Sequence, residues 1–212
     1  DQMGARDRAV QALMARGARV EAVHFPLMAQ ARDLWTAMLA SAGSDSTFAD
    51  HMFGTRSPLA PLKELGRLAM RRSDHTFPLI ALALFERLPE LTPARTKKLC
   101  GQALTLKLQL EDVLGDDGVL VTPTYPTVAP KHYKALLPPF NFVNCAIFNA
   151  LSLPVTAVPT GLNAGGVPTG VQVVATEGND HLTLACALAL ESTLGGWAYP
   201  VVSNVIPGAV AR

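Results

Sequence analysis

The chain has 212 residues, of which 49% are hydrophobic and 17% are charged, and its formal net charge is +1. The apolar content excludes a disordered chain, and a charged share below the usual quarter indicates a large interior. The small net charge gives no electrostatic basis for binding nucleic acid or an anionic membrane. We therefore expect one large globular domain with no nucleic acid among its partners.

The chain opens with a pattern typical of an α/β protein. Residues 6–16 predict a helix that places Val10, Leu13 and Met14 on one face and ends at Gly17. Residues 19–25 are rich in strand-forming side chains and predict a short strand. Pro26 begins a second predicted helix, whose expected buried residues are Leu27, Met28, Leu34, Trp35, Met38 and Leu39. This helix–strand–helix order favours an α/β sheet fold.

The next segment is more polar and predicts helices only. Residues 44–74 predict two short helices, around Phe48 and Leu62, and residues 76–88 predict a strongly apolar helix. That apolar run is too short to span a bilayer. Residues 1–8 are charged and no apolar core follows them, so we expect no signal peptide. We expect a cytoplasmic location and leave open a membrane association through a segment N-terminal to this chain.

A long helix and a strand follow. Thr92 is the predicted N-cap of the helix, and Pro93 occupies its first turn. Spacings of four and three predict one buried stripe, made of Leu99, Ala103, Leu106, Leu110 and Val113. Residues 115–118 predict a turn, and residues 119–122 predict a strand closed by Pro123.

Residues 135–176 contain no acidic or basic side chain and no histidine, but they do contain five prolines and four glycines. They predict a helix over 140–150 and two strands, over 155–158 and 171–175, joined by a hairpin-like turn. Strands without charge are typical of sheets buried on both faces.

No complete catalytic constellation is found in these residues. There is no GxSxG motif, and Ser152 is interpreted as a packed or capping serine. The histidines show neither HExxH nor a pair at i, i+4, and residues 161–170 lack the GxGxxG spacing, so we expect no metal and no cofactor. The cysteines, Cys100, Cys145 and Cys186, are interpreted as reduced and buried.

Three motifs occur in order along residues 119–191. They supply Pro123, Thr124 and Pro126; then Asn149, Pro154, Pro159 and Gly161; then Gly166, Pro168, Gly170 and Gln172. In this order they resemble the C-terminal half of the amidase signature family. Residues 138–142, 179–185 and 195–197 look closest to the fatty-acid amide hydrolase 2 branch.

The resemblance implies a three-layer α/β/α sandwich with a mixed central sheet, of which residues 1–212 form the C-terminal portion. It also implies a serine amidase. The family uses a nucleophilic serine, a second serine on a cis peptide and a neutral lysine base, all in an N-terminal portion with a GGSSGG-like loop. This sequence contains no such loop, and we assign no catalytic residue here. We expect the chain alone to be inactive, with that N-terminal portion as its partner and an amide as the substrate.

The resemblance places an acyl pocket beside the helix of residues 140–150. The matching positions are Pro139, Phe142 and Ala146, with Phe140 and Cys145 nearby. A wall without charge suits an apolar acyl chain. Ordinary core packing stays open as an alternative for Phe142 and Ala146. A non-catalytic α/β module that binds an apolar ligand or a protein partner stays open for the whole chain, as does a homo-oligomer.

Overall fold

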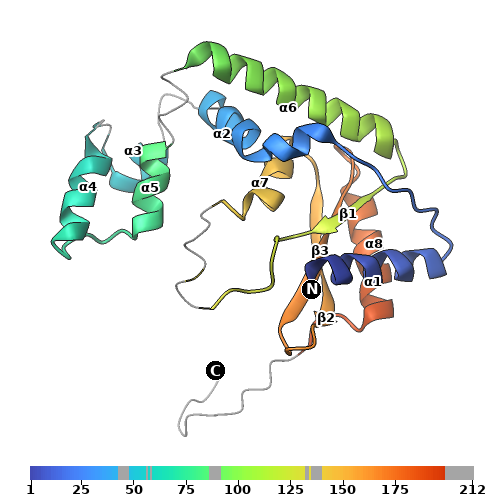
Figure 1. The fold of residues 1–212 in the computed structure, drawn as a ribbon. Helices are drawn as coiled ribbons and strands as arrows, with labels where there is room; N and C mark the ends of the chain where they lie inside the picture. Colours follow the sequence, from blue (N-terminus) through green and yellow to red (C-terminus); the bar gives the residue numbers. More distant parts are fainter. Residues whose placement is uncertain are drawn as a thin grey trace, which may run out of the picture.

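The computed structural model describes residues 1–42, 48–55, 57, 59–85, 92–131, 134 and 140–198, which fold around a three-stranded sheet (Figure 1). Strand β3 (Pro168–Val174) lies between β1 (Leu120–Pro123) and β2 (Val155–Leu162) and is antiparallel to both. The strands predicted over residues 119–122, 155–158 and 171–175 and the hairpin between β2 and β3 are confirmed. The three strands pair only in antiparallel fashion, so any parallel strand of the predicted mixed sheet lies outside them.

The central strand is the most deeply buried. Val171, Val173 and Val174 are fully inaccessible to solvent, as predicted for an uncharged strand with a layer on each face. For β2 the same prediction is wrong, because Ala157 and Leu162 are exposed. Strand β2 is an edge strand of the described sheet, and its outer side has no described neighbour.

Helices α1 (Gln2–Ala15) and α8 (Asp180–Leu194) cover one face of the sheet (Figure 1). Leu190 of α8 packs against Val171 and Val173 in one apolar cluster. Helix α8 ends at Gly195, which has a φ of 85° and so adopts the left-handed conformation that glycine tolerates best. The N-cap position of α8 is Asn179, one residue before the predicted Asp180.

The buried face of α1 is made of alanines. Ala5, Ala9 and Ala12 are buried, and the predicted Leu13 packs half-buried against the same cluster, whereas the predicted Met14 is 48% exposed and lies outside this face. Small side chains allow the helix axis to approach the sheet closely. The packing gained by this close approach outweighs the burial of larger apolar side chains.

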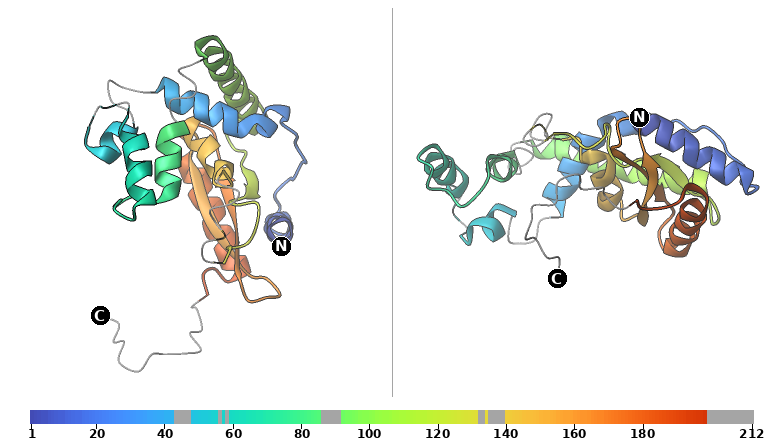
Figure 2. Two further views of the ribbon diagram at one scale, coloured as in Figure 1. Left: turned by 60° about the vertical axis from the view of Figure 1, so that its left-hand side comes forward. Right: turned by 90° about the horizontal axis from the view of Figure 1, so that it is seen from below.

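Helices α2 (Ala31–Ser41), α6 (Pro93–Leu114) and α7 (Val143–Ala150) form the layer on the other side of the sheet (Figure 2). The buried core of this layer consists of Leu34, Ala103, Leu106, Leu110, Ile147, Phe148, Leu151, Leu153 and Val174. A sheet between two helical layers confirms the predicted sandwich, present here in part.

Helix α6 differs from its prediction at both ends. Its buried stripe ends in Leu114, and the predicted Val113 is half exposed, because Leu114 continues the spacing of four from Leu106 and Leu110. Thr92 occupies the N-cap position, but its side chain makes no capping hydrogen bond.

The strand predicted over residues 19–25 does not form. These residues run without regular structure from α1 to the short 3₁₀ helix η1 (Pro26–Gln30), and Val20 and Val23 are exposed. No described strand lies beside them, so their preference for extended structure has no pairing to stabilise it.

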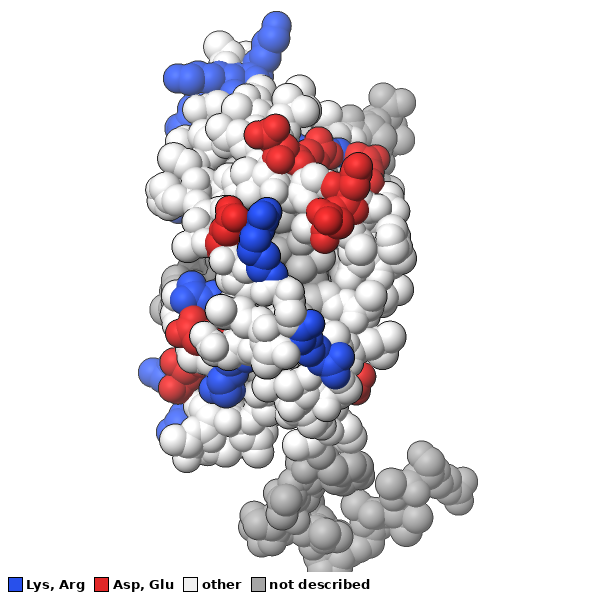
Figure 3. Space-filling view, turned by 90° about the vertical axis from the view of Figure 1, so that its right-hand side faces the viewer, with Lys and Arg blue, Asp and Glu red and all other residues white. Residues whose placement is uncertain are grey.

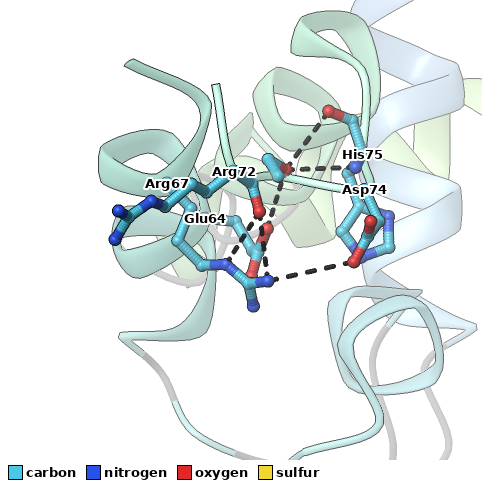
Figure 4. Close-up of polar contacts among 6 residues, drawn as sticks. Glu64, Arg67, Arg72, Asp74 and His75 are labelled. Carbon is cyan, nitrogen blue, oxygen red and sulfur yellow. Dashed lines mark hydrogen bonds and ion pairs between the residues drawn. The ribbon is translucent and has the colours of Figure 1, made fainter. Parts of the chain in front are cut away.

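Helices α3 (Phe48–Phe53), α4 (Ala60–Ala69) and α5 (Phe77–Phe85) form a group set apart from the sandwich (Figures 1 and 2). Their presence confirms three predicted helices. A buried carboxylate stabilises the group (Figure 4): Glu64 accepts hydrogen bonds from Arg67 at 2.9 Å and from the hydroxyl of Ser73 at 2.8 Å. Arg67 also donates to the carbonyl oxygen of Arg72, which connects α4 to the loop before α5.

The face seen in Figure 3 carries both acidic and basic side chains, separated by broad uncharged areas. It shows no uniformly basic surface, as expected from the net charge. Among the helices that the structure describes, none is long and apolar enough to cross a membrane.

Helix α6 offers a matched test of the core. We expect Leu106→Ala to lower the free energy of unfolding by about 2–5 kcal/mol, because it leaves a cavity in the layer next to the sheet. Leu108→Ala, on the same helix but 57% exposed, is expected to change it by only about 0.5 kcal/mol. Urea denaturation of both variants measures the difference. Equal losses would contradict the placement of α6.

Candidate functional site

Helix α7 separates the core from the predicted site. Val143, Ile147 and Phe148 point into the core, whereas Phe142 and Ala146 lie one turn apart on the opposite side. Phe142 is 38% exposed and Ala146 is half-buried. Among the described residues, Phe142 is therefore not part of the buried core.

An aromatic cluster forms at the start of α7. The ring of Phe142 meets the ring of Trp35 edge-to-face, with centroids 5.1 Å apart, and Phe140 lies 6.3 Å from Phe142. Arg32 lies over the ring of Phe140, with 5.8 Å between the guanidinium carbon and the centroid. Sequence analysis missed Trp35 as a site residue, because its position in an apolar helical stripe predicts only burial.

Cys145 and Pro139 complete the predicted set. The thiol of Cys145 donates a hydrogen bond to the carbonyl oxygen of Thr124, with 2.9 Å between the two atoms. Burial raises the pKa of the Cys145 thiol above its ordinary value, which suits a packed residue and not a nucleophile. Pro139 lies outside the described residues.

Gln172 fixes the start of α7 relative to the sheet. Its side-chain amide donates to the carbonyl oxygens of Asn144, at 2.8 Å, and of Pro123, at 3.1 Å. The side chain is 1% exposed, and its oxygen accepts no hydrogen bond from the described residues. A buried acceptor without a donor is uncommon in folded proteins.

A cavity of about 320 Å³ lies between α2, α5 and the start of α6. Trp35 and Phe140 line it, so it adjoins the aromatic cluster, whereas Phe142, Cys145 and Ala146 do not line it. Three leucines, each from a different helix, are among its lining residues, namely Leu39, Leu82 and Leu99. Its size is at the lower end of the range typical of ligand pockets.

Neither Ser152 nor Lys107 lies in an environment that suits a nucleophile or a base. Ser152 is exposed and occupies the turn after α7, with a φ of 56°. The hydrogen bond that Lys107 donates to Glu177 raises the pKa of Lys107, so this lysine stays protonated and cannot serve as a neutral base. No group of three metal-ligating side chains occurs in the part of the chain that the structure describes.

The pKa of Cys145 gives a test of this geometry. Alkylation needs the thiolate, so we expect the reaction of Cys145 with iodoacetamide to reach half its maximal rate at a higher pH in the folded chain than in urea. Peptide mass spectrometry assigns the modified residue, and Cys145→Ser is the control for that assignment. A folded-state midpoint equal to or below the unfolded one would show that the thiol is not desolvated.

Comparison with known proteins identifies the fold and the family. The family model described as Amidase matches residues 2–184. The chain is 44% identical over 188 residues to human fatty-acid amide hydrolase 2, covering 87% of this chain and 35% of the human protein. It is 39% identical over 195 residues to fatty-acid amide hydrolase 2-A of Danio rerio, covering 90% of this chain and 36% of that protein. The chain thus spans about a third of the length of these relatives.

Solved structures show the same fold. One comes from work titled "An unexpected vestigial protein complex reveals the evolutionary origins of an s-triazine catabolic enzyme", with a TM-score of 0.64 at 21% identity over 91% of this chain and 39% of that one. Allophanate hydrolase of Kluyveromyces lactis gives a TM-score of 0.63 at 22% identity, over 92% of this chain and 30% of that one. With the family model covering most of the sequence, the chain belongs to the amidase family.

Proposed function

We propose that this chain is the C-terminal portion of a serine amidase that hydrolyses carboxylic amides with an apolar acyl chain. The observation that supports this most strongly is the aromatic cluster beside α7, in a chain 44% identical to a fatty-acid amide hydrolase. The portion that carries the chemistry in the family, with its two serines and lysine, is a separate part of the proposed enzyme. Residues 1–212 then supply sheet scaffold and one wall of the acyl pocket.

The proposed wall acts through apolar contact. An acyl chain that lies against Phe142 and Trp35 removes apolar surface from water and contacts an edge-to-face aromatic pair. Phe140 and Ala146 extend this surface, and Cys145 contributes its half-buried thiol without a charge. Pro139 belongs to the same proposed wall by its position in the sequence.

Contact between wall and acyl chain positions the amide carbonyl at a fixed distance from the wall. In the proposed enzyme the serine of the N-terminal portion attacks that carbonyl carbon, and backbone N–H groups of its glycine-rich loop stabilise the resulting oxyanion. The binding energy of the acyl chain, which lies far from the reacting bond, therefore helps to orient that bond for attack.

The wall is tested by the dependence of activity on acyl-chain length in the enzyme that contains both portions. We expect Phe142→Ala to lower kcat/KM for a long-chain amide about tenfold or more, because it removes a large aromatic contact. For a short-chain amide, which does not reach the wall, we expect little change.

Leu188→Ala is the control for that measurement, because Leu188 is 66% exposed on α8, on the other side of the sheet. This variant should leave kcat/KM for both substrates unchanged. If Phe142→Ala lowers activity equally on short and long amides, or on neither, Phe142 does not contact the acyl chain.

A further inference from the structure

Three hydrogen bonds from side chains connect β1, β3 and α7 in pairs. Gln172 in β3 donates from its amide nitrogen to the carbonyl oxygen of Pro123, the last residue of β1, at 3.1 Å. The same nitrogen donates to the carbonyl oxygen of Asn144 in α7 at 2.8 Å. The thiol of Cys145, also in α7, donates to the carbonyl oxygen of Thr124, directly after β1. Each of the three connections therefore ends on a backbone carbonyl and ties the backbone of one element to another.

The amide of Gln172 acts here as a double donor. Its nitrogen carries two hydrogens, and the carbonyl oxygens of Pro123 and Asn144 provide one acceptor for each of them. Rotation of the amide by half a turn would place its oxygen against these two carbonyl oxygens, so the acceptors fix its orientation. The side chain is 1% exposed, so bulk water does not compete for the contacts. Gln172 thus holds two backbone segments together from inside the core.

Phe142 is bonded directly to the turn that these contacts hold. It occupies the N-cap position of α7, and its carbonyl oxygen accepts the backbone N–H groups of Cys145 at 3.0 Å and of Ala146 at 3.1 Å. Its ring meets the ring of Trp35, which belongs to another helix. A shift of the first turn of α7 would therefore move Phe142 relative to Trp35.

We propose that Gln172 is a positioning residue for acyl-chain selectivity, which acts by holding Phe142 in place, with the thiol of Cys145 as a second connection. This inference rests on the proposed function, because it concerns the wall at Phe142, and it adds the residue that keeps the wall at a fixed distance from the sheet. Selectivity follows because a long acyl chain needs the wall at that distance, whereas a short chain does not reach it.

The test is the ratio of kcat/KM for a long-chain amide to kcat/KM for a short-chain amide, in the enzyme that contains both portions. This ratio does not depend on the fraction of enzyme that is folded, so a merely structural role of Gln172 leaves it unchanged. Gln172→Met keeps the side-chain length and removes both donors. We expect it to lower the ratio about tenfold, because two hydrogen bonds are lost.

Thr183→Val is the matched control, because it also removes a buried polar group that is hydrogen-bonded. Thr183 is 2% exposed, lies in α8 on the other side of the sheet, and shares a hydrogen bond with Thr156. This variant should lower stability and leave the ratio unchanged. An unchanged ratio in Gln172→Met, or an equal fall in both variants, would overturn the proposal.

A double variant separates this proposal from the proposed function. If Gln172 acts through Phe142, adding Gln172→Met to Phe142→Ala lowers the ratio no further. A further fall in the double variant would overturn the proposal. A ratio that falls in Phe142→Ala but not in Gln172→Met would overturn the positioning role and leave the wall standing. A ratio that falls in Gln172→Met but not in Phe142→Ala would overturn both.

Cys145 provides an independent test should Gln172→Met fail to fold. Cys145→Ala loses the hydrogen bond to Thr124, and we expect the ratio to fall about threefold. Cys145→Ser keeps a donor at the same position and should restore most of the ratio. Equal ratios in Cys145→Ala and Cys145→Ser would show that the hydrogen bond does not position the wall and would overturn the proposal.

Discussion

Burial of the central strand β3 is the constraint on which the rest of the structure depends. Its valines face two helical layers, and its backbone pairs with a strand on each side. Between these valines, the buried side-chain amide of Gln172 donates to two backbone carbonyl oxygens, and these hydrogen bonds join the end of β1 to the first turn of α7. A buried amide costs free energy unless its groups are paired, so these contacts favour a fixed position of the first turn of α7 against the end of β1. Phe142 lies directly before that turn.

The aromatic wall and the charged cavity share two residues but differ in chemistry. Phe142 offers aromatic surface, whereas Arg32, Asp33 and Arg95 place charged groups in the lining of the neighbouring cavity. Trp35 and Phe140 belong to both. Arg32, Asp33 and Trp35 all lie in the first five residues of helix α2 and line the cavity.

The sequence predicts much of the fold, for identifiable physical reasons. Uncharged residues in β3 and the leucine spacing in α6 predict their elements, because the burial of both is fixed by local pattern. Residues 19–25 form no strand, because strand formation depends on a neighbour that the sequence does not specify. The alanine face of α1 was also missed, since close helix–sheet approach is a tertiary property. At the site, motif matches indicate Phe142 and Ala146, whereas Trp35 and the Arg32–Asp33–Arg95 cluster depend on contacts between helices distant in sequence.

The central claim is that residues 1–212 supply scaffold and apolar surface while the bond-breaking groups belong to the N-terminal portion of the amidase. A fluorophosphonate probe, which modifies activated serines, tests it directly by mass spectrometry. We expect the chain alone to stay unlabelled at every serine, and the enzyme with both portions to be labelled on a serine of the N-terminal portion. Stoichiometric labelling of a serine within this chain, such as Ser152, that disappears in the Ser152→Ala variant would contradict the claim.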